Sequence, residues 1–164
     1  MPVDELLTRL RRVEDELAIQ RLLLSYGPAA DAGLTGFAGA VWCKQGVYDW
    51  DADGEPHRGR AAVDAMLVSD GHQDLISRGA AHFAGPPLTE IDGDTATALN
   101  YSLIMVRRAD AFELWRVSAV RWDLERTGSS WRVRRRTNRL LDASGGGSRL
   151  LGETLQELFG AEPR

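Results

Sequence analysis

Apolar side chains near the N-terminus follow the spacing of an amphipathic helix. The apolar positions recur about every 3.6 residues with charged residues between them: Leu6, Leu10, Val13, Leu17 and Leu24. Asp4 can cap the start, which predicts a helix that runs to about Tyr26. Gly27 and Pro28 then interrupt or kink it, and a further turn places Asp31 near a helix end.

Shorter elements are predicted next. Residues 35–42 are apolar and contain glycine, which favours another helical turn. Residues 46–50 are aromatic and β-branched and predict a strand with Tyr48 and Trp50 on one face. Residues 51–54 predict a turn, and the alanine-rich stretch 59–68 predicts a helix.

Strand-forming residues dominate the second half. Three segments rich in Thr, Val, Ile, Tyr and Trp, at 94–107, 112–126 and 130–141, are separated by turn signals and predict consecutive antiparallel strands. A strand at 78–84 and a short one before the turn at 91–94 complete the sheet. Helices followed by a strand meander predict an α+β fold, with the helices on one face of a curved, mainly antiparallel sheet.

The C-terminal part has a different amino-acid composition. Residues 144–148 read Ser-Gly-Gly-Gly-Ser and predict a flexible hinge, and residues 149–159 predict a terminal amphipathic helix. The chain therefore divides into a main domain over 1–143 and a hinge with a helix over 144–164.

Composition narrows the classes of function. At 164 residues, 43% of them hydrophobic, the chain suffices for one domain with one core. The net charge of −4 argues against a nucleic-acid partner. Lys44 is the only lysine, which makes Schiff-base chemistry improbable, and Cys43 is the only cysteine, which excludes intramolecular disulfides. The charged N-terminus and the lack of a long apolar run predict a cytoplasmic protein without membrane association.

Motifs for cofactors and metals are incomplete. Asp49-x-Asp51-x-Asp53-Gly54 matches the opening of a calcium loop, but the twelfth position is Arg60 where a bidentate Glu is needed. The glycines of 33–39 do not reproduce a dinucleotide fingerprint, and a Gly-x-Ser-x-Gly elbow is absent from the sequence. We therefore expect neither metal nor cofactor.

Arginines alternate along the last predicted strand. Arg132, Arg134 and Arg136 would line one of its faces. Such a face can bind an anion, but a solvated or salt-bridged face is the commoner outcome.

The three histidines differ in their neighbours. His57 and His72 lie among turn-like polar residues, which predicts exposure. His82 lies among small apolar residues in a predicted strand, where an unpaired polar group would cost about 1–3 kcal/mol. We therefore expect His82 to be buried and paired, as a core residue or as a catalytic base.

An ordered series of short motifs resembles one family. The pieces are Tyr26 with Asp31, residues 47–50, residues 59–63, Ala81 with His82, residues 91–97, and Trp131 with Arg136. In this order and spacing, over about residues 3–141, they resemble the SnoaL-like branch of the nuclear-transport-factor-2-like superfamily. That group includes scytalone dehydratase, bile-acid 7α-dehydratase and hexachlorocyclohexane dehydrochlorinase.

The resemblance implies a cone-shaped α+β barrel around one apolar pocket, often in dimers or trimers. It implies that Asp31 orients His82 as a general base and that Tyr26 polarises a substrate oxygen. It also implies that Tyr48 and Trp50 form apolar walls.

Further pocket positions follow from the same resemblance. Asn100 falls where the scytalone enzyme has its second histidine, and an amide can orient a carbonyl or water but cannot exchange protons. On the fourth strand, Trp115 or Arg121 would face inward.

The predicted function is that of a cofactor-independent lyase, a dehydratase acting on a small apolar cyclic substrate of polyketide, steroid or aromatic type. A ketosteroid-isomerase-like isomerase, a polyketide cyclase and a non-catalytic ligand-binding protein stay open as alternatives. Epoxide hydrolysis would need Arg121 with Asp123 as part of a water-activating set.

Overall fold

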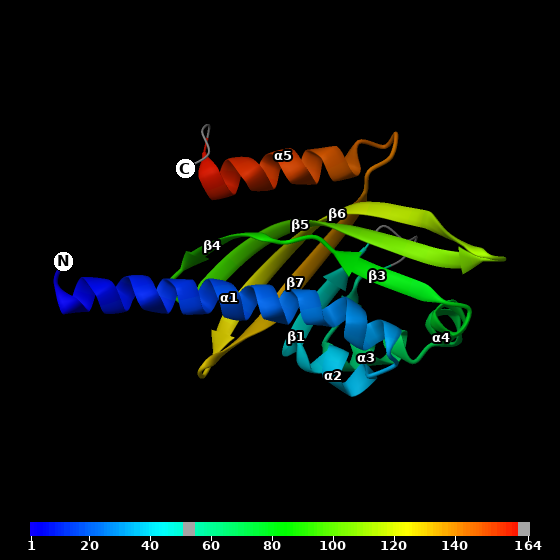
Figure 1. The fold of residues 1–164 in the computed structure, drawn as a ribbon, viewed down its shortest axis with the longest axis horizontal. Helices are drawn as coiled ribbons and strands as arrows, with labels where there is room; N and C mark the ends of the chain where they lie inside the picture. Colours follow the sequence, from blue (N-terminus) through cyan, green and yellow to red (C-terminus); the bar gives the residue numbers. More distant parts are fainter. Residues whose placement is uncertain (51–54, 161–164) are drawn as a thin grey trace.

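The computed structural model describes residues 1–50 and 55–160, which form five helices and a seven-stranded curved, unclosed sheet (Figure 1). The helices are α1 (Val3–Asp31), α2 (Thr35–Ala40), α3 (Arg60–Leu67), α4 (Asp70–Ser77) and α5 (Gly146–Phe159). The strands are β1 (Trp42–Asp49), β2 (His57–Arg58), β3 (Ala80–Ala84), β4 (Leu88–Asp92), β5 (Thr95–Arg108), β6 (Ala111–Thr127) and β7 (Ser130–Leu140).

The sheet has the order β2-β1-β7-β6-β5-β3. Both β4 and β3 pair with β5: β4 pairs with residues 95–99 of β5, and β3 pairs with residues 102–106. β1 and β7 run parallel, and the other pairs are antiparallel. The predicted α+β class and mainly antiparallel sheet are confirmed.

α1 continues to Asp31 as one helix with Pro28 inside it. The predicted further turn is present, because the backbone N–H of Ala32 donates to the carbonyl of Pro28 at 3.0 Å. Gly27 explains how closely α1 approaches β3: a Cβ at this position would lie 2.1 Å from the carbonyl oxygen of His82. Only a residue without a side chain permits this contact.

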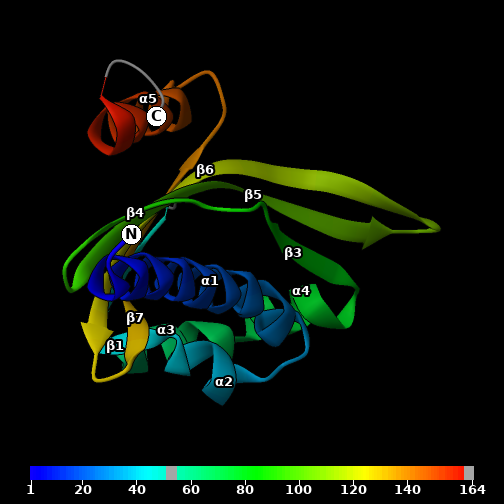
Figure 2. The same ribbon diagram turned by 60° about the vertical axis from the view of Figure 1, so that its left-hand side comes forward.

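The core lies between the sheet and the helices α1, α2 and α3, which share one face of it (Figure 2). Its largest fully buried side chains are Trp42, Trp122, Ile19, Leu23, Leu67 and Leu124. Burying each of the four aliphatic side chains in this set contributes about 1.5–3 kcal/mol.

α5 packs on the opposite face of the sheet from α1 (Figures 1 and 2). It begins at Gly146, so two of the predicted hinge glycines start the helix instead. Gly147 is buried, and a Cβ there would lie 2.5 Å from the carbonyl oxygen of Leu140. The glycines thus bring α5 close to the end of β7.

A bulge in β7 changes which arginines share a face. Asp123 pairs with Arg135 and Leu124 with Val133, which leaves Arg134 as the extra residue. Arg134 is exposed and Arg136 is buried. The prediction that Arg132, Arg134 and Arg136 share one face is therefore wrong, because the extra residue shifts the alternation.

Candidate active site

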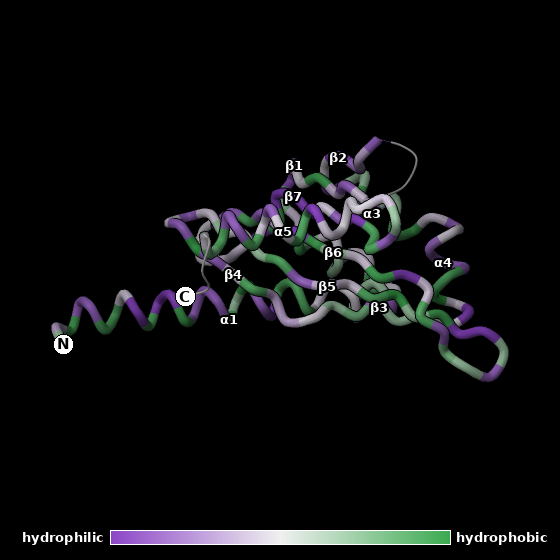
Figure 3. The backbone as a smooth tube through the Cα atoms, turned by 90° about the horizontal axis from the view of Figure 1, so that it is seen from above, coloured by the Kyte–Doolittle hydropathy of each residue, from purple (hydrophilic) through white to green (hydrophobic). Residues whose placement is uncertain are grey.

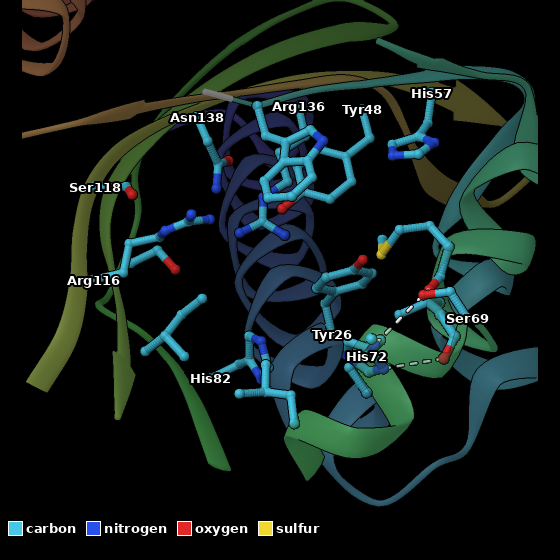
Figure 4. Close-up of a pocket in the computed structure, with 18 of the residues that line it drawn as sticks. Tyr26, Tyr48, His57, Ser69, His72, His82, Arg116, Ser118, Arg136 and Asn138 are labelled. Carbon is cyan, nitrogen blue, oxygen red and sulfur yellow. Dashed lines mark hydrogen bonds between the residues drawn. The ribbon is translucent and has the colours of Figure 1, made fainter. Parts of the chain in front are cut away.

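The concave side of the sheet and the helices α1, α3 and α4 line a partly open cavity of about 410 Å³ (Figure 4). This volume suits a small organic ligand. Residues from α1, β1, β2, α3, α4, β3, β5, β6 and β7 line it. α5 contributes no lining residue.

Asp31 and His82 meet at the wall of this cavity. Oδ1 of Asp31 lies 2.5 Å from Nδ1 of His82, and Oδ2 accepts the backbone N–H of His82 at 2.7 Å. Both side chains are about one-fifth exposed, at 21% and 19%. The carboxylate therefore holds the strand and the ring together, and the last turn of α1 sets the orientation of the imidazole.

This pairing selects the tautomer of His82. A carboxylate only accepts hydrogen bonds, so the proton of the neutral ring is on Nδ1. Nε2 then carries a lone pair, and the ring lines the cavity (Figure 4). A carboxylate on Nδ1 also stabilises the imidazolium that forms when Nε2 takes a proton.

Tyr26 is a buried phenol that lines the same cavity. Burial raises its pKa strongly, with the neighbouring Tyr48 adding to the rise, and Arg136 opposes the shift. The hydroxyl thus stays protonated at neutral pH and is available as a hydrogen-bond donor. Trp42 and Trp122 pack edge-on against its ring at 6.0 and 6.3 Å between centroids.

Arg136 is a buried cation, 7% exposed, within a cage of aromatic rings. Its Cζ lies 5.1 Å from the ring centroid of Tyr26, 4.8 Å from that of Tyr48 and 4.5 Å from that of Trp122. Within residues 1–50 and 55–160 no carboxylate forms an ion pair with it, and its Nε has no hydrogen-bond partner. Such a guanidinium can stabilise negative charge that develops on a ligand. In the sequence, Arg136 stands out only as one of the motif residues that resemble the SnoaL-like branch.

Three aromatic side chains that the sequence predicts as pocket residues line the cavity: Tyr48 and Trp50, the predicted walls, and Trp115 on β6. The guanidinium of Arg116 lies between two of them, 5.3 Å from the ring centroid of Trp50 and 5.1 Å from that of Trp115. His57 also lines the cavity, half-buried and stacked on Trp50 at 6.5 Å between centroids, so the prediction that it is exposed is wrong. Its pairing with Tyr48 across β1 and β2 brings it there.

His72 lines the cavity as well, and its predicted exposure is also wrong. It lies on α4, a helix that the sequence pattern does not predict because none of its residues is buried. Ser69 at the N-cap was a usable signal for this helix. The ring centroids of His72 and His82 are 5.7 Å apart.

Two predicted pocket residues do not line the cavity. Asn100 is buried against the core, where its Nδ2 donates to the carbonyl of Gly85 at 2.8 Å and its Oδ1 accepts from Nε1 of Trp122 at 3.0 Å. Its amide is therefore occupied by the protein.

Arg121 points away from the cavity toward α5. Its side chain pairs with Asp123 at 2.9 Å and with Glu157 of α5. It alternates along β6 with residues that face inward, namely Val120 and Trp122, which are buried in the core. The prediction that Arg121 faces inward is therefore wrong, because its two neighbours along β6 occupy the inward positions.

Asp49, the first residue of the calcium-like motif, pairs with Arg135 and Arg139. Asp51 and Asp53 lie outside the described residues. The parts of the chain that the structure describes contain no group of three His, Cys, Asp or Glu side chains that could hold a metal ion. Within residues 1–50 and 55–160, no helix has the length and hydropathy that a membrane span requires.

Residues 11–137 match the profile of the SnoaL-like domain. The chain belongs to the SnoaL-like family. Among curated proteins, none matches this sequence.

Solved structures agree with this assignment. An NTF2-like protein with a cystatin-like fold from Novosphingobium aromaticivorans is 38% identical, with a TM-score of 0.88 over 92% of this chain and 97% of that one. A protein of unknown function from Mycobacterium tuberculosis is 21% identical, with a TM-score of 0.70 over 96% and 93% of the two chains. A candidate scytalone dehydratase from N. aromaticivorans is 17% identical, with a TM-score of 0.66 over 86% and 89%. The SnoaL-like chain thus shares its fold with these proteins.

Proposed function

We propose that this SnoaL-like protein is a cofactor-independent lyase that removes water from a small cyclic hydroxy ketone. The observation that carries the proposal is the Asp31–His82 pair, with 2.5 Å between Oδ1 and Nδ1, at the wall of a largely apolar cavity. The fold shared with a candidate scytalone dehydratase supports the same reaction class.

The first step is removal of a proton. Nε2 of His82 takes a proton from the carbon next to the ketone, and Asp31 stabilises the imidazolium. The electron pair of the broken C–H bond moves onto the ketone oxygen. Arg136 and the phenol of Tyr26 stabilise that negative charge, because both line the cavity and Arg136 has no competing carboxylate among the described residues.

The second step expels the hydroxyl. The enolate reforms its carbonyl, a C=C bond forms, and the C–O bond at the β-carbon breaks. His82 returns its proton to the departing oxygen, so the products are water and an unsaturated ketone, and the enzyme regains its starting protonation state.

The walls set the kind of ring that fits. Tyr48, Trp50 and Trp115 offer flat apolar faces to a ring system, which matches a cyclic substrate of polyketide, steroid or aromatic type. The molecular volume of a bicyclic ketone is well below the cavity volume of about 410 Å³.

A direct test uses 3-hydroxy-1-tetralone, which yields 1-naphthol after loss of water and tautomerisation. The release of 1-naphthol is followed by absorbance. We expect His82→Ala and Asp31→Asn to lower kcat by about 10²–10⁴-fold. Asp123→Asn is the matched control, because Asp123 pairs with Arg121 away from the cavity. Equal rates in wild type and His82→Ala would overturn the proposal.

Isomerisation and cyclisation begin with the same proton abstraction, so one observation must separate them from elimination. Deuterium exchange at the α-carbon of 1-tetralone in D₂O reports that step alone. Exchange without release of 1-naphthol from the hydroxy ketone would favour an isomerase or cyclase. Absence of both activities would favour a ligand-binding protein.

A further inference from the structure

His72 presents a second imidazole to the cavity, beside the proposed base. Its Nδ1 lies 3.0 Å from the carbonyl oxygen of Leu67, which also accepts from Nε2 of Gln73 at 2.8 Å. A carbonyl only accepts, so Nδ1 of His72 carries the proton. Nε2 of the neutral ring is therefore an acceptor.

The surroundings keep this ring neutral. Burial lowers the pKa of His72, and the nearby His82 lowers it further, while Leu67 and the carboxylate of Asp31 oppose the shift. When His82 takes up a proton, a second positive charge 5.7 Å away, measured between ring centroids, becomes still less favourable. With Nδ1 donating to Leu67, the neutral ring has a lone pair on Nε2 that can accept a hydrogen bond.

We propose that Nε2 of His72 accepts a hydrogen bond from a substrate hydroxyl and selects substrates that carry the hydroxyl next to the carbon facing His82. The two rings are neighbours, so they suit substituents on adjacent carbons of one ligand. The role within the reaction rests on the proposed dehydration: His82 protonates the leaving oxygen while His72 holds the hydrogen already on it. Water leaves with both hydrogens, and His72 neither gains nor loses a proton.

A binding experiment tests this without turnover. The probes are 2-tetralol and tetralin, which differ by one hydroxyl and have no carbonyl to acidify a C–H bond. Wild type should prefer 2-tetralol, and His72→Phe should lose about tenfold of that preference while its tetralin affinity stays within about twofold. His72→Gln, whose Oε1 can accept, should retain part of the preference. An unchanged preference in His72→Phe would overturn the inference.

Nitrogen NMR of the ring gives an independent reading. At pH 7 the ¹⁵N shifts should show His72 protonated on Nδ1 and bare on Nε2, and a doubly protonated ring or the opposite tautomer would refute the assignment. If the protein releases 1-naphthol but His72→Phe keeps the preference for 2-tetralol, the proposed lyase activity stands and the role of His72 is refuted. If His72→Phe loses the preference but the wild type releases no 1-naphthol, the role of His72 stands and the lyase activity is refuted.

A second inference rests on the outer half of α1. Its apolar residues are exposed and are spaced alternately three and four apart, as in a coiled-coil heptad: Val3, Leu6, Leu10, Val13 and Leu17. Among the described residues of α1, burial begins only at Ile19, and the helix projects past the sheet (Figures 1 and 3). An isolated helical segment as short as the part of α1 before Ile19 is only marginally stable in water.

Charges beside the stripe point to the partner. In a parallel pair, Arg9 would face Glu14 of a second copy, and Glu16 would face Arg21, so both pairs have opposite signs. Each residue turns an α-helix by about 100°, so the apolar stripe from Val3 to Leu17 lies on the side of α1 opposite Ile19 and the other buried residues. Two copies can thus pair while their sheets lie on the outside. We infer that α1 forms a parallel two-stranded coiled coil with a second copy of this chain.

Sedimentation equilibrium tests the pairing. Wild type and Thr8→Glu, which adds the same charge off the stripe, should have the mass of a dimer, and Leu10→Glu should be a monomer with lower helicity. Binding of 2-tetralol confirms that Leu10→Glu is folded. A monomeric or trimeric wild type, or a Leu10→Glu variant that stays dimeric, would overturn the inference.

Discussion

Gly27 is the position at which a single methyl group would separate the two members of the proposed catalytic pair. A Cβ there would lie 2.1 Å from the carbonyl oxygen of His82, while ordinary contact begins near 3.4 Å, so Gly27→Ala requires a shift of about 1.3 Å between α1 and β3. Asp31 is on the same helix one turn later. A shift of that size would stretch the 2.5 Å bond to His82 beyond hydrogen-bond distance.

The expected cost follows from two effects. Overpacking costs about 1–3 kcal/mol, and a hydrogen bond to a charged group contributes about 1.5–3 kcal/mol. Alanine recovers about 0.5–1 kcal/mol because it favours the helix over glycine. We therefore expect Gly27→Ala to lower the free energy of unfolding by about 2–5 kcal/mol.

Urea unfolding followed by tryptophan fluorescence measures this loss, and proton NMR follows the Nδ1–H resonance of His82. Gly36→Ala is the matched control, because a Cβ on this glycine of α2 meets nothing within 4 Å. It should leave stability equal or raise it by up to about 1 kcal/mol. Wild-type stability together with an unchanged His82 resonance in Gly27→Ala would refute the reasoning.

Other predictions concern residues around the cavity. Asn100→Ala should lower the free energy of unfolding by about 1–3 kcal/mol, because Trp122 loses its acceptor, with little change in 2-tetralol affinity by calorimetry. Arg121→Ala should cost about 1 kcal/mol or less in a urea titration and speed amide exchange in α5, where Glu157 loses its partner. The pKa of His72 lies below its ordinary 6.5, so the unfolded chain binds that proton first and the free energy of unfolding falls as the pH drops below about 6.5. His72→Gln should flatten this fall in urea titrations over pH 5–7, and an unchanged slope would contradict it.

Local patterns sufficed for most elements. Periodicity predicted α1, and the β-rich composition predicted the three long strands to within a few residues. Such patterns work because burial of one face repeats along each element. They failed for α4, which buries no residue and therefore has no clear apolar repeat.

Side-chain direction was harder to predict than element type. Alternation along a strand holds only until a bulge, and the extra residue at Arg134 moved Arg136 to the inner face. Asn100 lies in a predicted strand, but the partners Gly85 and Trp122 come from elsewhere in the chain. These contacts depend on how strands pair, which a single strand does not encode.

The order of residues along the chain is enough to predict the α+β class, the place of Asp31 at a helix end and the need of His82 for a partner, because each depends on near neighbours in the sequence. That Asp31 is this partner follows from the three-dimensional fold, since 51 residues separate the two and the contact depends on the approach of α1 to β3 at Gly27. The fold also brings His72 to the same cavity, because α4 packs against β3, the strand that carries His82.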